Sequence, residues 1–251
     1  MGGAGTLATS GGAASAGSAN PGGSGGSSAG SGGTNAGSGG SAAGSAGAAG
    51  GTADGSWIID NTTSIHGFVP QLIGAPVVEN GDQGAALCFD GDDGIVLDAN
   101  PIEGLAAFTL EVLFMPEAVS AAETALIEPR FVHIESATGD RATVEARVND
   151  SEFYLDTFLK SGTQSLTLID EAKVHPVGAW YWTALSYADG QMRHFVEGVE
   201  DASGSVTVMP LGPGKISIGV RQNLQYWFKG CVRELRVTSE ALPPESLQRV
   251  E

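Results

Sequence analysis

The stretch RATVEARVNDSEFYLDTFLK, residues 141–160, decides the fold, because apolar side chains recur in it at every second position. In its first half apolar and polar residues alternate without a break, and the same alternation resumes after Asn149. A period of two is typical of a strand that has one face on the core. We therefore predict two paired strands, Ala142–Val148 and Glu152–Leu159.

Similar short segments follow one another from residue 56 onward, separated by turn residues such as the hairpin dipeptide Asp189-Gly190. Many short strands with turns between them are typical of an all-β sandwich of two antiparallel sheets. One helical turn is expected, at Pro243–Arg249. The predicted strands are Ser56–Asp60, Ala85–Asp90, Ile95–Leu97, Phe108–Met115, Ala125–Glu135, Ala142–Val148, Glu152–Leu159, Ser165–Ile169, Trp180–Tyr187, Met192–Glu197, Lys215–Val220 and Phe228–Thr238.

Composition divides the chain in two. Residues 1–55 are almost entirely Gly, Ser, Ala, Thr and Asn, with no aromatic residue and one charge, Asp54. Such a segment buries too little apolar surface to offset the entropy of ordering its backbone. We predict a disordered, low-complexity tether over 1–55 and a single domain over 56–251, which has the length to form a sizeable core.

The net charge of the domain limits the kinds of partner that it can bind. All 12 basic residues and 28 of the 29 acidic ones follow residue 55, so the domain carries a net charge of −16. This charge repels phosphate backbones, and we expect no nucleic-acid partner.

The sequence contains no run of 18 apolar residues, so we predict no transmembrane helix. No signal peptide follows Met1, yet a tether before a binding-type domain suits the cell surface. Either the protein is cytosolic or this sequence lacks its export segment; we expect the second, an extracellular or cell-surface protein.

The two cysteines leave the redox compartment open. A disulfide between Cys88 and Cys231 would close a loop of about 140 residues. Strand alternation opposes this pairing, because Cys88 points away from the face shared by Leu87 and Phe89, whereas Cys231 shares the parity of Leu235. A β-bulge would reconcile the two positions, so the sequence leaves the disulfide undecided.

Three segments carry a resemblance to a known family. Residues 87–96, LCFDGDDGIV, are similar to the opening strand pair of laminin-G-like jelly rolls of the concanavalin A-like lectin/glucanase superfamily. Residues 108–116, FTLEVLFMP, resemble another of their strands, and 180–247 hold the longest match. The resemblance implies a jelly-roll sandwich whose first and last strands lie side by side.

Most matched residues have structural roles. Phe89, Phe108, Leu110, Val112, Phe195 and Leu235 are core candidates, and we also expect Trp180 and Trp182 in the core. The four histidines lack the spacing of a metal site, and His194 alternates with apolar neighbours, which predicts an inward side chain.

The predicted function is carbohydrate or protein recognition without catalysis, with a glycan or a cell-surface protein as partner. The alternatives are a glycan-cleaving hydrolase or lyase and a structural adhesin or spacer domain. Glucanases of this fold carry paired carboxylates as E-x-D-x-x-E. Here Glu123 and Glu128 have the outer spacing but lack the middle Asp. The oligomeric state stays open.

The candidate binding residues lie on the polar face of the strand pair in 141–160. If these strands pair through Asn149–Ser151, that face gathers Glu145, Arg147, Tyr154 and Asp156. The simpler interpretation, which we favour, is a solvated face with cross-strand ion pairs. The functional interpretation is a polar groove with an aromatic platform for a sugar.

A calcium site is the other candidate. Many members of this fold bind a structural calcium ion near the first and last strands, and Asp90, Asp92 and Asp93 offer the oxygen ligands that calcium prefers. Where the family has an acidic ligand, this sequence has Arg233. We therefore expect either calcium at the three carboxylates or an ion pair that replaces it. No other cofactor is expected.

Overall fold

The computed structural model describes residues 54–250. The tether predicted for 1–55 lies outside the described residues except for its last two positions, and the first strand begins at Gly55. Among residues 54–250, none of the helices has the length and apolarity needed to cross a membrane.

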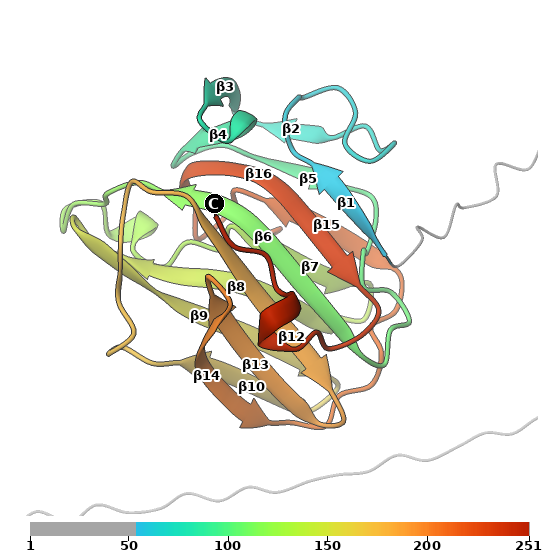
Figure 1. Cartoon of the computed structure of the whole chain (residues 1–251). Coiled ribbons are helices and arrows are strands. Elements are labelled where there is room, and N and C mark those ends of the chain that lie inside the picture. Colours follow the sequence, from blue (N-terminus) through green and yellow to red (C-terminus); the bar gives the residue numbers. More distant parts are fainter. Residues whose placement is uncertain (1–53, 251) are drawn as a thin grey trace, which may run out of the picture. The chain divides into compact units, whose positions relative to one another are not determined.

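Two antiparallel sheets of eight strands each form a sandwich, as predicted (Figure 1). Sheet I runs in the order β14-β13-β12-β6-β16-β4-β3 with β1 beside β16, and sheet II runs β10-β9-β8-β7-β15-β5-β2 with β11 beside β9. The strands of sheet I are β1 Gly55–Ile58, β3 Val77–Gly81, β4 Gly84–Asp90, β6 Phe108–Pro116, β12 Tyr181–Ala188, β13 Gln191–Val196, β14 Val199–Ser205 and β16 Lys229–Thr238. The strands of sheet II are β2 Gln71–Ile73, β5 Gly94–Leu97, β7 Val132–Ser136, β8 Arg141–Val148, β9 Glu152–Ser161, β10 Gln164–Ile169, β11 His175–Pro176 and β15 Gly214–Ile218.

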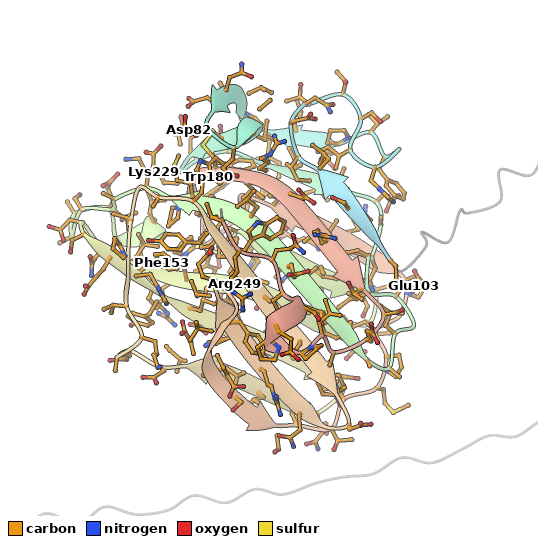
Figure 2. The ribbon with its side chains drawn as sticks, in the orientation of Figure 1. Asp82, Glu103, Phe153, Trp180, Lys229 and Arg249 are labelled. Atoms are coloured by element: carbon orange, nitrogen blue, oxygen red, sulfur yellow. A yellow bond between two sulfur atoms is a disulfide. The ribbon has the colours of Figure 1, made fainter. Side chains whose placement is uncertain are left out.

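The alternate apolar residues of both sheets meet in one core between the layers. Phe114 of sheet I stacks on Phe131, with ring centroids 4.3 Å apart, and meets the edge of Phe153 at 5.4 Å. Figure 2 labels Phe153 among the core side chains. Offset and edge-on ring contacts of this kind add to the gain from burying apolar area.

Strand pairing confirms two expectations. Strand β8 pairs with β9 over the whole of the decisive stretch, and β1 pairs with β16, so the first and last strands lie side by side. The β12–β13 hairpin turns at Asp189 and Gly190, whose φ angles of 50° and 76° are those of the tight turn that this dipeptide favours.

A bulge in β16 settles the cysteine question. The pairing with β6 shifts register between Val232 and Glu234, which leaves Arg233 as an extra residue. The bulge puts Cys231 on the outer face of sheet I although it has the parity of inward Leu235. Cys88 lies directly opposite on β4, and the two cysteines form a disulfide.

Several sequence expectations were wrong at the margins. The strand predicted for Ala125–Glu135 is a 3₁₀ turn, η1 (Thr124–Leu126), followed by a strand that starts only at Val132, because Pro129 has no N–H for a ladder. The expected turn at Pro243–Arg249 shrinks to η2 (Pro244–Ser246). Strands β2, β3, β11 and β14 were missed, because short or exposed edge strands lack clear alternation.

Neither Trp180 nor Trp182 lies between the sheets, which corrects the core prediction. Trp180 is half-buried on the outer face of sheet I, against the disulfide (Figure 2). Trp182 is buried outside the main core, and its backbone N–H bonds to the Glu197 carboxylate at 2.6 Å. His194, in contrast, is fully buried and lies 2.9 Å from the Thr157 hydroxyl, which confirms its inward position.

Candidate functional site

The outer face of sheet II brings together the four residues that sequence selected for ligand binding. Strand pairing sets Glu145 opposite Asp156 and Arg147 opposite Tyr154. All four point away from the core, because their alternate neighbours on β8 and β9 are the inward apolar residues. The predicted gathering is therefore present.

Ion pairs occupy the charges of this group. Arg147 holds Asp156 through its Nε at 2.8 Å and its Nη2 at 2.7 Å, and it also contacts Glu128. Arg130 lies 3.0 Å from Glu145. Glu145 and Asp156 are only 5% and 3% exposed, so both carboxylates lie under their arginine partners. This arrangement matches the simpler interpretation, a face with cross-strand ion pairs.

The pKa of Glu145 reflects how deeply this group of ion pairs is buried. Burial raises the pKa of Glu145, whereas the hydroxyl of Thr143 and the charge of Arg130 act against that rise. Arg130 and Arg147 thus compensate the charge of the buried carboxylates, and neither Glu145 nor Asp156 projects freely into solvent.

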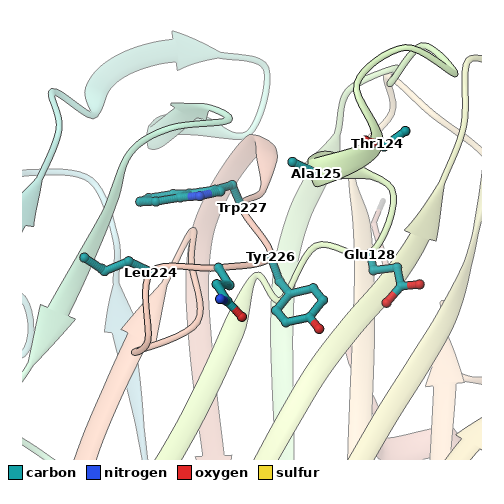
Figure 3. A pocket seen from close by; sticks show the side chains of 7 residues that line it. Thr124, Ala125, Glu128, Leu224, Tyr226 and Trp227 are labelled. Atoms are coloured by element: carbon teal, nitrogen blue, oxygen red, sulfur yellow. The ribbon is translucent and has the colours of Figure 1, made fainter.

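A pocket opens beside these ion pairs (Figure 3). It has a volume of about 470 Å³ and lies between η1 and the loop from β15 to β16. Its polar wall includes Glu128, which joins the pocket to Arg147 and the sheet II face. The lining residues are Thr124, Ala125, Glu128, Leu224, Gln225, Tyr226 and Trp227.

The β15–β16 loop holds a costly backbone shape at this pocket. Leu224 and Tyr226 have φ angles of 58° and 62°, a region that residues other than glycine rarely adopt. Two contacts fix the loop: the Arg130 N–H donates to the Tyr226 carbonyl at 3.1 Å, and the Arg130 guanidinium lies 3.6 Å from the Tyr226 ring centroid. Phe228 anchors the far end in the core.

The pocket offers the chemistry that a sugar ring requires. The half-buried rings of Tyr226 and Trp227 supply flat apolar surface, and Figure 3 shows the Trp227 indole beside Leu224. The Glu128 carboxylate and the Gln225 amide supply hydrogen-bonding groups. Apolar walls with a few polar groups are typical of small-ligand sites.

Sequence reasoning missed this pocket and its residues. The sequence does contain one signal that could have indicated this site, the consecutive aromatic residues Tyr226, Trp227 and Phe228. Because neighbouring side chains of extended backbone point to opposite faces, three such residues cannot all enter the core. At least one had to lie outside the core.

The predicted calcium ligands lie close together at the β4–β5 turn. Carboxylate oxygens of Asp90, Asp92 and Asp93 are within 4.8 Å of one another. Asp93 is buried and accepts the Asp90 backbone N–H at 3.2 Å, and burial with the neighbouring acids raises its pKa to about 6. The spacing and the oxygen donors fit a calcium ion, which remains a prediction.

The ion pair that was expected between Arg233 and these carboxylates is a prediction that the structure corrects. The Arg233 side chain extends over Gly84 and donates to the Ala85 carbonyl instead. Within residues 54–250, no ion pair joins it to the three aspartates. The bulge that carries Arg233 turns it toward the start of β4, away from the acidic turn.

The fold and sequence together identify the family. A laminin G-type family model, described as the concanavalin A-like lectin/glucanases superfamily, matches residues 89–248. The match covers more than half of the chain, so the protein belongs to the concanavalin A-like lectin/glucanase superfamily, as the resemblance predicted. The comparison with curated proteins found no significant match.

Solved structures with the same fold include two domains that were determined with a bound oligosaccharide. Domain 4 of AbnA, a GH43 extracellular arabinanase from Geobacillus stearothermophilus, was solved with arabinotriose; it is 18% identical at TM-score 0.52, covering 76% of this chain and 93% of that one. The CBM40 of the Ruminococcus gnavus IT-sialidase was solved with α2,3-sialyllactose; it is 14% identical at TM-score 0.50, covering 64% and 94%. The binding domain of botulinum neurotoxin serotype G is 8% identical at TM-score 0.54, covering 76% and 48%. At these identities the similarity establishes the fold alone.

Proposed function

We propose that this domain is a non-catalytic glycan-recognition module that acts outside the cell or at its surface. The observation that carries the proposal is the pocket in which Tyr226 and Trp227 lie beside Glu128. Aromatic faces stack on the C–H faces of sugars, and the carboxylate fixes hydroxyl groups. Two structural neighbours, the arabinanase domain and the CBM40, were solved with bound oligosaccharides, which supports this choice.

The absence of catalysis rests on how the carboxylates are held. A glycosidase needs one carboxyl group that donates a proton and a second that attacks or activates water. Here Glu145 and Asp156 are buried under Arg130 and Arg147, so each is tied to a fixed cation. Such pairs suit a rigid binding surface better than proton exchange.

A glycan array with Trp227→Ala tests the pocket. We expect the wild-type domain to bind a defined set of glycans and the variant to bind them at least about tenfold more weakly, because the stacking surface is lost. Trp180→Ala is the matched control: it removes an equally half-buried indole from the outer face of the other sheet. Tyr154→Ala measures whether the ligand extends along sheet II.

Three outcomes would contradict the proposal. Release of reducing ends from a bound polysaccharide would show that the domain is a glycan-cleaving enzyme. A wild-type domain that binds no glycan would favour the structural spacer. Equal loss of binding in Trp180→Ala and Trp227→Ala would remove the pocket from the site.

A further inference from the structure

An uneven distribution of basic residues marks the outer face of sheet II. The protein has a net charge of −17 and only 12 basic residues, yet half of these lie on or beside this one face. The six are Arg130, Arg141, Arg147, Lys160, Lys215 and Arg221. Acidic residues on or beside the same face pair with three of these cations, and the remaining positive charge is available to a partner of opposite charge.

Three of the six cations have no ion-pair partner within residues 54–250, and one of them, Lys160, donates to the Gly139 carbonyl at 3.2 Å instead. Arg130 and Arg147 pair with the buried acids, and Lys215 lies 3.4 Å from Asp98. Among residues 54–250, Arg141 and Arg221 form no ion pair, although acids outnumber bases by more than two to one. Their charges are therefore available to a ligand.

Arg130, Arg141 and Arg221 lie around His133, and we call these three residues the guanidinium cluster: Arg141 is opposite Glu135 on the neighbouring strand, and Gln222, next to Arg221, donates to the His133 carbonyl at 3.4 Å. Arg141 starts β8 and lies with its guanidinium 4.9 Å from the Phe158 ring centroid. Arg221 opens the β15–β16 loop. Burial, together with the nearby charges of Arg141 and Arg130, lowers the pKa of Arg221, whereas Glu135 acts in the opposite direction. Glu145 beside Arg130 and Glu135 beside His133 balance two of these three positive charges, so one further anion would balance the third.

Two buried polar groups in the same place lack partners. The Arg130 Nη1 atom is buried and makes no hydrogen bond within the described part of the chain. His133 is fully buried on this face, opposite Thr143, and neither ring nitrogen has a hydrogen bond there. Glu135 Oε2 lies 3.2 Å from His133 Nε2 but outside the direction of a ring N–H bond.

Buried polar atoms are normally hydrogen-bonded, and leaving one unpaired destabilises the fold. Burial, together with the charges of the three arginines, lowers the pKa of His133 to about 3, so the imidazole is neutral at pH 7. A neutral imidazole offers one donor and one acceptor, and guanidinium groups offer only donors. The Arg130 Nη1 atom therefore lacks an acceptor within the described residues, and the positive charge that Glu135 and Glu145 leave unbalanced favours an acceptor that carries negative charge.

We infer that Arg130, Arg141 and Arg221 form a subsite for an anionic group, a carboxylate or a sulfate, of an acidic glycan. The subsite adjoins the aromatic pocket through Tyr226, which lines the pocket and stacks on Arg130. A planar guanidinium binds two oxygens of a carboxylate or sulfate at once, so arginine suits either anion. This inference rests on the proposed glycan recognition and gives it a ligand class.

The test uses glycans in pairs that differ only in charge. Oligogalacturonate and its methyl ester supply the carboxylate pair, and a sulfated galactan oligosaccharide and its desulfated form supply the sulfate pair. We expect one acidic member to bind at least about tenfold more tightly than its neutral counterpart, and the pair that shows this difference identifies the anion.

Variants assign the preference to the cluster. Arg141→Gln and Arg221→Gln should each remove most of the acid-over-neutral difference, and Arg221→Lys should restore part of it, because lysine keeps the charge without the two-pronged geometry. Lys215→Gln is the control: this lysine lies on the same face, is 52% exposed and pairs with Asp98. It should leave the preference unchanged. Melting temperatures measured alongside exclude loss of fold.

Equal binding of acidic and neutral members would overturn the inference, as would a preference that Lys215→Gln lowers as much as Arg221→Gln. If Trp227→Ala still abolished binding in that case, glycan recognition by the pocket would stand without the anionic subsite. If no glycan of either charge bound, both proposals would fail.

Discussion

At the scale of single residues, backbone shape decides which aromatics are available to a ligand. Tyr226, Trp227 and Phe228 are consecutive, yet Phe228 is buried in the core while its two neighbours line the pocket. The left-handed backbone at Tyr226 produces this division, because it breaks the simple alternation of a strand. The order of apolar and polar residues along the sequence does not reveal the φ angle of Tyr226.

Asp93 gives a test of the calcium prediction. In chelator, Asp93→Asn should be about 1 to 2 kcal/mol more stable than wild type at pH 7. The pKa of Asp93 is raised to about 6 in the folded state, so the folded protein binds this proton more tightly than the unfolded chain does. Stability therefore falls as pH rises from about 4 to 6, and Asn is spared that loss. Urea unfolding at pH 4 and pH 7 measures the difference.

With calcium added, the order of the two proteins should reverse. The wild type should melt at a higher temperature, because a bound ion stabilises the folded state and offsets the repulsion among Asp90, Asp92 and Asp93. Asp93→Asn should not respond. Asp82→Asn, which removes an exposed acid from the β3–β4 turn (Figure 2), should respond like the wild type. A wild-type melting temperature indifferent to calcium would remove the metal site.

At the scale of elements, one extra residue in β16 changes which face a side chain occupies. A shift of one residue moves every later side chain to the other side of a sheet. The bulge at Arg233 makes that shift, so Cys231 and Leu235 lie on opposite faces despite equal parity. The sequence pattern predicted both strands and indicated that a disulfide would require a bulge. Only the structure shows that the bulge is present.

The disulfide should contribute measurably to stability. Cys88→Ala with Cys231→Ala should lower the free energy of unfolding by about 2 to 4 kcal/mol, because the link spans 143 residues and restricts the unfolded chain. Denaturant unfolding with and without reductant measures this effect. Reductant should destabilise the wild type and leave the double variant unchanged; equal stability of all four samples would contradict the prediction.

At the scale of the whole molecule, the segment after β16 closes the outer face of sheet I (Figure 1). Leu247 packs on Ala184 and Phe195, which explains why Phe195 is buried although it lies outside the main core. The Gln248 N–H donates to the buried Glu111 carboxylate at 2.7 Å. The sandwich is therefore covered on this side by its own C-terminal chain.

Removing that cover should weaken the fold. Leu247→Ala should lower the free energy of unfolding by about 2 to 3 kcal/mol, because it leaves apolar surface of Phe195 uncovered. Glu245→Ala, two residues away along the chain and exposed, is the control and should change stability little. Thermal and denaturant unfolding compare the two. Similar effects of both substitutions would show that the segment does not pack as described.

The sequence by itself determined the sandwich, most of its core residues and the polar face of β8 and β9, because alternation with a period of two is a local property. It could not determine the pocket, in which Glu128 and Trp227 meet although they are far apart along the chain. Nor could it show that Arg141 and Arg221 lie on the same face as His133, where neither forms an ion pair within residues 54–250. Those contacts follow from the order of the strands and from the shape of the loops between them, and only the tertiary structure decides both.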